Sequence, residues 1–166
     1  MNVDLARRYG RAEGGARVVD DAPVNRPRAT TVEAAMGPEG PLAVSTWAGG
    51  TTKARFLGWV RGELAPLLRA GDVVAMDNLS AHRAAGVADA VRARGARVLY
   101  LPPYSPDLNP VEKMWSKMKA LLRGLRARDP GALPGAVGWA LAQVTPSDCA
   151  GWFRSCGYAV EVPSTA

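Results

Sequence analysis

Short stretches of apolar and β-branched residues occupy the first half of the chain, and turn-forming residues separate them. Residues 30–36 and 42–47 are strand-like, and Gly37-Pro38-Glu39-Gly40-Pro41 lies between them. Glycine and proline in such a linker favour a tight turn. The pattern therefore predicts a β-hairpin over residues 30–47.

Apolar residues then recur at helical spacing, and short apolar runs interrupt them. We expect a helix capped by Thr51 or Thr52 and ending near Pro66, followed by a buried strand at 72–76. A helix from Ser80 to Gly95 and a second buried strand at 98–101 come next. Three further helices are predicted, at 109–125 with Pro110 in its first position, at about 134–144 and at about 147–153.

A hairpin followed by alternating helices and strands predicts an α/β fold with a mixed sheet flanked by helices. The length of 166 residues fits one domain. We expect residues 1–29 to form an irregular start and residues from about 130 to 166 to form a C-terminal helical segment.

The net charge of the chain indicates what kind of molecule it binds. Lys and Arg total 21 against 15 Asp and Glu, which gives a net charge of +6 and favours a polyanion such as nucleic acid. An Arg-rich composition also arises from a GC-rich genome, so charge alone leaves both explanations open. Two cysteines, no apolar signal region and no membrane-length apolar run favour a cytoplasmic protein that does not interact with membranes.

Two carboxylates follow the predicted buried strands. Asp77 comes directly after the strand at 72–76, and Glu112 lies in the first turn of the helix after the strand at 98–101. Ligands of α/β sheets bind at the carboxyl ends of the strands, so both acids are expected at one edge. Carboxylates that converge there need a cation, and hard divalent metals prefer oxygen ligands. Each acid alone also has a local explanation: Asp77-Asn78 can start a turn, and Glu112 can reach back to the Asn109 amide in a capping box.

The residues around these acids form a longer pattern. It consists of Val74-Ala75-Met76-Asp77-Asn78 with His82, and of Leu101-Pro102-Pro103-Tyr104-Ser105-Pro106-Asp107-Leu108-Asn109-Pro110-Val111-Glu112 leading to Trp115. On these motifs, the segment from Asp72 to about Arg123 resembles the DDE catalytic domain of bacterial insertion-sequence transposases in the mariner-like superfamily. Weaker similarity covers residues 6–12 and 153–158.

The resemblance implies a ribonuclease-H-like fold and DNA transposition, with strand cleavage and strand transfer that depend on two Mg²⁺ or Mn²⁺ ions. It makes Asp77 the second and Glu112 the third acid of the catalytic triad, and both would be metal ligands. The implied partner is double-stranded DNA, at element ends and target, and the active form would be a homo-oligomer. The setting would be the bacterial cytoplasm.

The first acid of the triad has no evident counterpart. Only Met1 to Leu5 precede the Ala6-Arg7-Arg8-Tyr9-Gly10 stretch, so we expect the central first strand and its acid to be absent. Asp4, Asp20 and Asp21 remain alternatives, and Asp21 close to the other two acids would make a stand-alone metal nuclease. The expected protein is a truncated or split transposase with impaired activity. The alternative is a non-catalytic DNA-binding or regulatory fragment that pairs with a full-length transposase or with a separate helix-turn-helix chain.

Other polar residues are expected to assist. Lys113, Lys117 and Arg123 lie on the cationic side of the helix at 109–125 and are candidates for DNA phosphate contacts, although a solvated helix face explains them almost as well. Asn78, His82 and Asn109 are candidates for orienting groups beside the two acids. We expect Trp115 to pack in the core.

Overall fold

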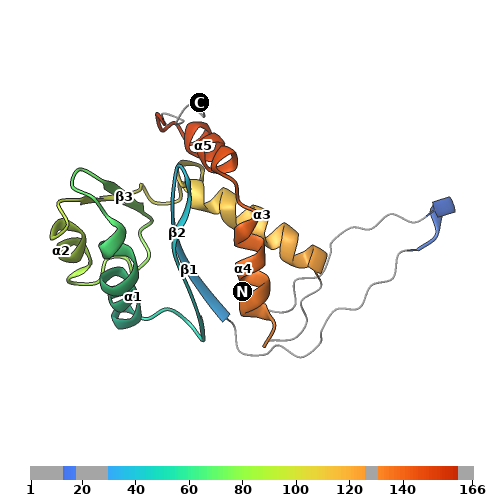
Figure 1. Cartoon of the computed structure of the whole chain (residues 1–166), viewed down its shortest axis with the longest axis horizontal. Helices are drawn as coiled ribbons and strands as arrows, with labels where there is room; N and C mark the ends of the chain where they lie inside the picture. Colours follow the sequence, from blue (N-terminus) through green and yellow to red (C-terminus); the bar gives the residue numbers. More distant parts are fainter. Residues whose placement is uncertain (1–12, 18–29, 126–130, 161–166) are drawn as a thin grey trace.

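The computed structural model describes residues 13–17, 30–125 and 131–160, and Asp4, Asp20 and Asp21 lie outside these ranges. The elements follow the expected order (Figure 1). The strands are β1 (Thr30–Gly37), β2 (Gly40–Ala48), β3 (Val73–Met76) and β4 (Arg97–Tyr100). The α-helices are α1 (Lys53–Trp59), α2 (Val87–Arg92), α3 (Pro110–Leu125), α4 (Leu133–Ala142) and α5 (Pro146–Ser155).

The predicted hairpin is confirmed. β1 and β2 pair antiparallel from Thr30 opposite Ala48 to Gly37 opposite Gly40, and the register shifts between Ala34 and Met36. The turn is thus shorter than the predicted five residues. After the hairpin, the Thr52 side chain accepts a hydrogen bond from the Arg55 amide and caps α1, as one of the two predicted caps. A π-helical turn and a 3₁₀ turn continue the chain to Leu67.

The second sheet is a parallel pair, in which Val73 lies opposite Arg97 and Met76 opposite Tyr100. The helix between these strands is shorter than predicted and Ser80 does not cap it. It begins only after Gly86, whose φ of 89° is a left-handed conformation that ends the preceding turns. The prediction of strands buried on both faces is also wrong, because Val73 and Leu99 are each 45% exposed. Among the described residues, each of these strands pairs with one other strand.

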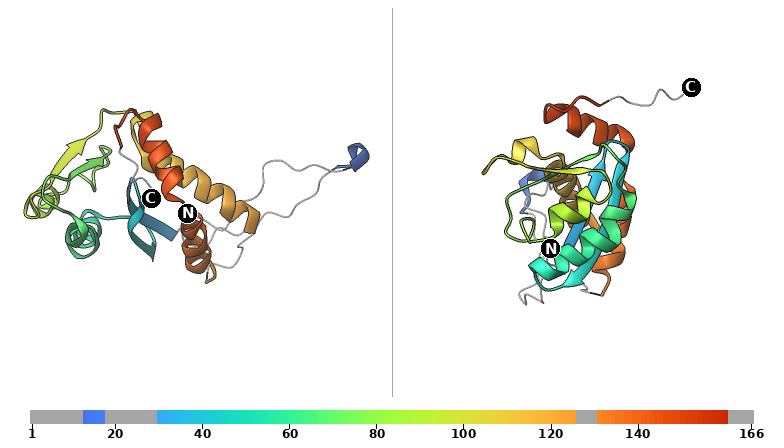
Figure 2. Two further views of the ribbon diagram at one scale, coloured as in Figure 1. Left: turned by 45° about the horizontal axis from the view of Figure 1, so that its top comes forward. Right: turned by 90° about the vertical axis from the view of Figure 1, so that its left-hand side faces the viewer.

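The hairpin lies between α1 and α2 on one side and the C-terminal helices on the other (Figure 2), and a hydrophobic cluster packs on each side of it. On one side, α1, α2, β3 and the π-helical turn pack around residues such as Phe56, Val60 and Val91. On the other side, Met114, Met118 and the residues of α4 and α5 form the second cluster. Alternate hairpin residues face opposite ways, since Ala35 and Trp47 pack on the first cluster while Val32, Ala34, Met36 and Val44 pack on the second. Both faces of the hairpin are therefore covered.

The C-terminal helices pack on α3. Pro110 is the first residue of α3, as predicted, and Met114, Met118 and Leu122 form its buried face. Thr145 and Asp148 form a capping box at the start of α5. Asp148 also accepts a hydrogen bond from Lys117 Nζ at 2.5 Å, so one carboxylate both caps α5 and ties it to α3. The Cys149 and Cys156 thiols are free and buried.

A cavity of about 570 Å³ lies between the two sheets, and residues of both β1 and β3 line it. The described residues contribute no strand between β1 and β3, and the two sheets are separate. The hydrogen bonds of β3 show which of its two edges is paired with β4. The carbonyls of Asp72 and Met76 accept hydrogen bonds from the β4 side, so Val73 and Ala75 direct their peptide groups away from β4. In the described part of the chain, the predicted mixed sheet is therefore present as two separate pairs of strands, β1 with β2 and β3 with β4.

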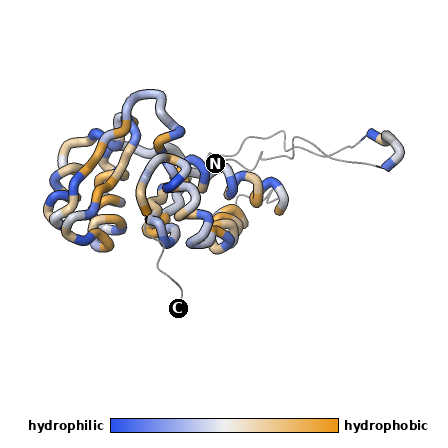
Figure 3. Tube along the Cα trace, turned by 90° about the horizontal axis from the view of Figure 1, so that it is seen from above, coloured by the Kyte–Doolittle hydropathy of each residue, from blue (hydrophilic) through white to orange (hydrophobic). Residues whose placement is uncertain are grey.

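Hydrophobic residues are distributed in short stretches over all elements (Figure 3). Among the described helices, none is both long and apolar enough to cross a membrane.

Candidate functional site

Asp77 and Glu112 are brought to the same region by different elements. Asp77 is the first residue after β3, and Glu112 lies in the first turn of α3. Both line the cavity between the sheets, and both also line a smaller adjoining cavity formed by the loop from Leu101 to Pro106. The two acids therefore share the lining of both cavities, and their role as a metal-binding pair stays a prediction.

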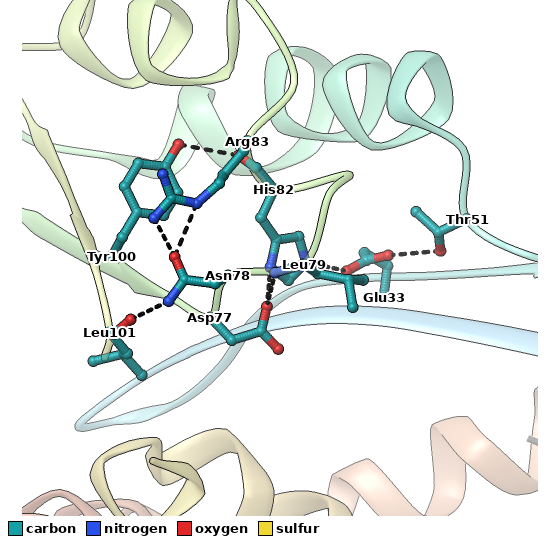
Figure 4. Close-up of polar contacts among 9 residues, drawn as sticks. All are labelled: Glu33, Thr51, Asp77, Asn78, Leu79, His82, Arg83, Tyr100 and Leu101. Atoms are coloured by element: carbon teal, nitrogen blue, oxygen red, sulfur yellow. Dashed lines mark hydrogen bonds and ion pairs between the residues drawn. The ribbon is translucent and has the colours of Figure 1, made fainter. Parts of the chain in front are cut away.

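The Asp77 carboxylate is held through one oxygen (Figure 4). Its Oδ1 accepts a hydrogen bond from the Leu79 amide at 2.9 Å, which is the turn interaction that the sequence allowed. The same oxygen lies 2.6 Å from His82 Nδ1, although the ring is not aligned for a hydrogen bond. The side chain is 50% exposed. Asp77 thus serves the turn with Oδ1, while Oδ2 is available to a ligand.

The Glu112 carboxylate is exposed and makes no hydrogen bond or ion pair with any residue in the described ranges. The alternative capping box needs the Asn109 amide as a donor to this carboxylate. That amide instead donates to the Pro106 carbonyl at 3.1 Å, within the turn that precedes α3. Glu112 therefore does not form the capping box that was the alternative explanation for an acid at this position.

Asn78 joins the ends of the two parallel strands. Its Nδ2 donates to the Leu101 carbonyl, and its Oδ1 accepts a hydrogen bond from Arg83 Nε at 2.9 Å. The Arg83 guanidinium in turn lies over the Tyr100 ring at 4.5 Å from its centroid. These contacts fix the strand ends from which Asp77 projects (Figure 4).

His82 sits between two acids, one of which the sequence analysis missed. Its Nε2 lies 4.0 Å from Glu33 Oε1, and its ring packs on Phe56 with the centroids 4.5 Å apart. Thr51 Oγ1 donates to Glu33 Oε2 at 3.2 Å. Burial raises the pKa of the Glu33 carboxyl, and the Thr51 hydrogen bond and His82 partly oppose that rise. The one available signal was a lone acid in a strand of Thr, Val and Ala.

Asn109 lines both cavities beside Glu112. The candidate phosphate contacts Lys113, Lys117 and Arg123 are all partly exposed on α3. The Lys117 ammonium is already paired with Asp148, and this pair holds the pKa of Asp148 down at about 2.

The donors at the cavity fit a hard divalent cation, because Asp77 Oδ2 and the Glu112 carboxylate provide oxygen atoms that no described residue engages. Within the described ranges, no group of three or more His, Cys, Asp or Glu residues is arranged to hold a metal. Asp77 and Glu112 are therefore the two candidate ligands, and no described residue adds a third acid to complete a metal site.

The fold is that of solved transposase structures. The chain aligns over 93% of its length with a pre-cleavage Mos1 transpososome, with a TM-score of 0.66 and 19% identity, and covers 52% of that chain. It also aligns over 91% of its length with a Mos1 mariner paired-end complex with Mn, with a TM-score of 0.65 and 18% identity, and covers 47% of that chain. The Mos1 catalytic domain aligns over 80% of this chain and 76% of that domain, with a TM-score of 0.56 and 18% identity. The α/β, ribonuclease-H-like fold class expected from the sequence is confirmed.

The sequence places the chain in a family. Residues 1–133 match the family described as DDE superfamily endonuclease, and the chain belongs to that family. Over 55 residues the chain is also 42% identical to the Tcb1 transposable-element transposase of Caenorhabditis briggsae. The match spans 33% of this chain and 20% of that protein. The resemblance to DDE transposases of the mariner-like superfamily, expected from the sequence, is confirmed.

Proposed function

We propose that this chain is the DNA-processing domain of a transposase, in which Asp77 and Glu112 bind Mg²⁺ or Mn²⁺. The observation that carries the proposal is that these two carboxylates line the same cavities, each with oxygen atoms free for a ligand, in a member of the DDE superfamily endonuclease family. When bound, a pair of such ions supplies an activated water or hydroxyl and stabilises the leaving oxygen of a phosphodiester.

The residues of the chain then have separate tasks. Asp77 presents Oδ2, because Leu79 and His82 hold its other oxygen. Glu112 approaches from α3, and Asn109 lines the cavities beside it. Asn78 keeps the ends of β3 and β4 together. Lys113 and Arg123 contact DNA phosphates, with Lys117 contributing once its pairing with Asp148 is broken.

The proposed reaction is phosphodiester hydrolysis at element ends followed by attack of a 3′ hydroxyl on target DNA. The chain covers about half of the solved Mos1 chain in the pre-cleavage complex. Among the described residues, two acids are available for the ions rather than three. We therefore propose weak activity for this chain alone, and full activity only in a homo-oligomer or together with a full-length transposase or a chain that recognises the element ends.

The test combines metal binding with DNA cleavage. Mn²⁺ binding to the purified chain is measured by electron paramagnetic resonance, and nicking of supercoiled plasmid is followed in Mn²⁺ and in Mg²⁺. Asp77→Asn and Glu112→Gln should each weaken Mn²⁺ binding at least about tenfold and abolish nicking. Asp107→Asn is the matched control, because Asp107 is exposed, lies near Glu112 in sequence and lines neither cavity. Unchanged binding in Glu112→Gln would remove Glu112 as a ligand.

One observation favours a second function, a non-catalytic DNA-binding or regulatory role: no third acid stands in position within the described ranges. The same experiment separates the two functions. A wild-type chain that binds duplex DNA in a salt-dependent manner, but neither binds Mn²⁺ nor nicks plasmid, would support the regulatory role and refute the nuclease.

A further inference from the structure

An acid on the hairpin faces the site through the single histidine of the sequence. Glu33 lies on β1, and its side chain is 15% exposed. One of its oxygens accepts the Thr51 hydrogen bond, and the other lies 4.0 Å from His82 Nε2. The opposite ring nitrogen lies 2.6 Å from Asp77 Oδ1. The four side chains therefore form a continuous row from Thr51 to Asp77 (Figure 4).

His82, at the centre of this row, is also held by residues outside it. The His82 ring packs on the buried Phe56 ring, and the His82 carbonyl accepts a hydrogen bond from the Tyr100 hydroxyl at 3.1 Å. These contacts fix the position of the ring but leave its rotation about the Cβ–Cγ bond undetermined. In the observed orientation each ring nitrogen faces a carboxylate, and a half-turn about the Cβ–Cγ bond would bring ring carbons to both carboxylates, so Glu33 contributes to how the ring meets Asp77.

The position of Glu33 is costly for folding. Burial raises the pKa of its carboxyl, which means that the ionised form is less favourable in the folded chain than in water. Its neighbours on the same strand are Val32 and Ala34, which carry no such cost. A stabilising role alone would therefore be served better by an uncharged residue of similar size.

We infer that Glu33 is a positioning residue for Asp77, which acts by orienting His82 so that Asp77 keeps Oδ1 turned inward and Oδ2 toward the metal. This inference rests on the proposed function, since it gives Asp77 the role of a ligand. It adds a residue from the hairpin, 44 positions before Asp77 in the chain, to a site otherwise built from β3 and α3.

The first measurement is Mn²⁺ binding to the full chain with Glu33→Gln, Glu33→Asp and Glu39→Gln. The glutamine keeps the shape of Glu33 and removes its charge, so binding should weaken about tenfold while the melting temperature stays equal or rises. Glu33→Asp keeps the charge and should bind within about threefold of the wild type. Glu39→Gln is the matched control, because Glu39 is exposed in the turn of the same hairpin and should bind as the wild type does.

The second measurement needs no metal. Because His82 is the only histidine, side-chain ¹⁵N NMR of the metal-free chain reports on it without assignment. Glu33→Gln should shift both ring-nitrogen resonances, and Glu39→Gln should shift neither.

The outcomes separate the two ideas. If the wild type binds Mn²⁺ and Glu33→Gln binds it equally well, or if the ring resonances do not move, the positioning role is wrong and the proposed function stands. If the wild type binds no Mn²⁺, the proposed function fails and the role of Glu33 fails with it. An unfolded or strongly destabilised Glu33→Gln would also overturn the inference, since Glu33 would then be structural.

Discussion

Replacing Asp148 with asparagine tests whether one carboxylate joins α5 to α3. The pKa of Asp148 is lowered from 3.8 to about 2, first by the Lys117 hydrogen bond and then by the Thr145 backbone hydrogen bond. At about 1.4 kcal/mol per pKa unit, the charged form gains roughly 2 kcal/mol in the folded chain. The side chain is 28% exposed, and solvent screens part of this gain. We therefore expect Asp148→Asn to lower the free energy of unfolding by about 1–2 kcal/mol at pH 7.

The measurement is urea denaturation of both proteins between pH 7 and pH 2. The folded pKa is depressed, so the stabilisation is fully present above pH 3.8 and is lost as the pH falls toward 2. The two unfolding curves should converge over that interval. Asp89→Asn is the control, because the Asp89–Arg92 pair is 74% and 72% exposed and its loss should cost no more than about 0.5 kcal/mol. Equal effects of the two substitutions, or a difference that persists at pH 2, would refute the reasoning.

Two further predictions concern packing and backbone conformation. Met118 is fully buried in the cluster beneath α3, so Met118→Ala should cost about 2–5 kcal/mol in urea denaturation. Gly95 has a φ of 73°, and an added Cβ would lie 2.9 Å from Ala70 Cβ, so Gly95→Ala should destabilise the fold by about 1–3 kcal/mol. Gly138→Ala in α4 meets open space and should be neutral or stabilising by up to about 1 kcal/mol, which makes it the matched control for Gly95→Ala.

The sequence predicted best the elements whose stability is encoded locally. Pro110 at the first position and an apolar residue on every third or fourth position placed α3 correctly. The helix expected from Ser80 was wrong because the apolar pattern continues through Gly86, whereas the backbone there is left-handed and a Cβ at this position would meet the Leu57 and Arg61 side chains. Those neighbours are about 25–29 positions away in the chain, so no local pattern contains them.

The site divides in the same way. Asp77 and Glu112 could be predicted as a pair from the sequence, because Asp77 directly follows one strand, Glu112 begins the helix after the next strand, and strand ends meet at one edge. The capping role of Glu112 could be tested only in the structure, where the Asn109 amide donates to the Pro106 carbonyl. Glu33 was missed because its partners lie across the hairpin and beyond α1, and an acid in a two-stranded ribbon reads as solvent-facing.

Because both faces of the hairpin are packed, the hairpin couples the unfolding of the two hydrophobic clusters. Its odd-numbered β1 residues lean on the α1 side and its even-numbered ones on the α3 side. Unfolding of either cluster would expose one face of the hairpin and thereby destabilise the hairpin on which the other cluster packs. The two clusters should therefore unfold as one cooperative unit. Heat should therefore produce one sigmoidal transition, with far-ultraviolet circular dichroism and tryptophan fluorescence reporting the same midpoint.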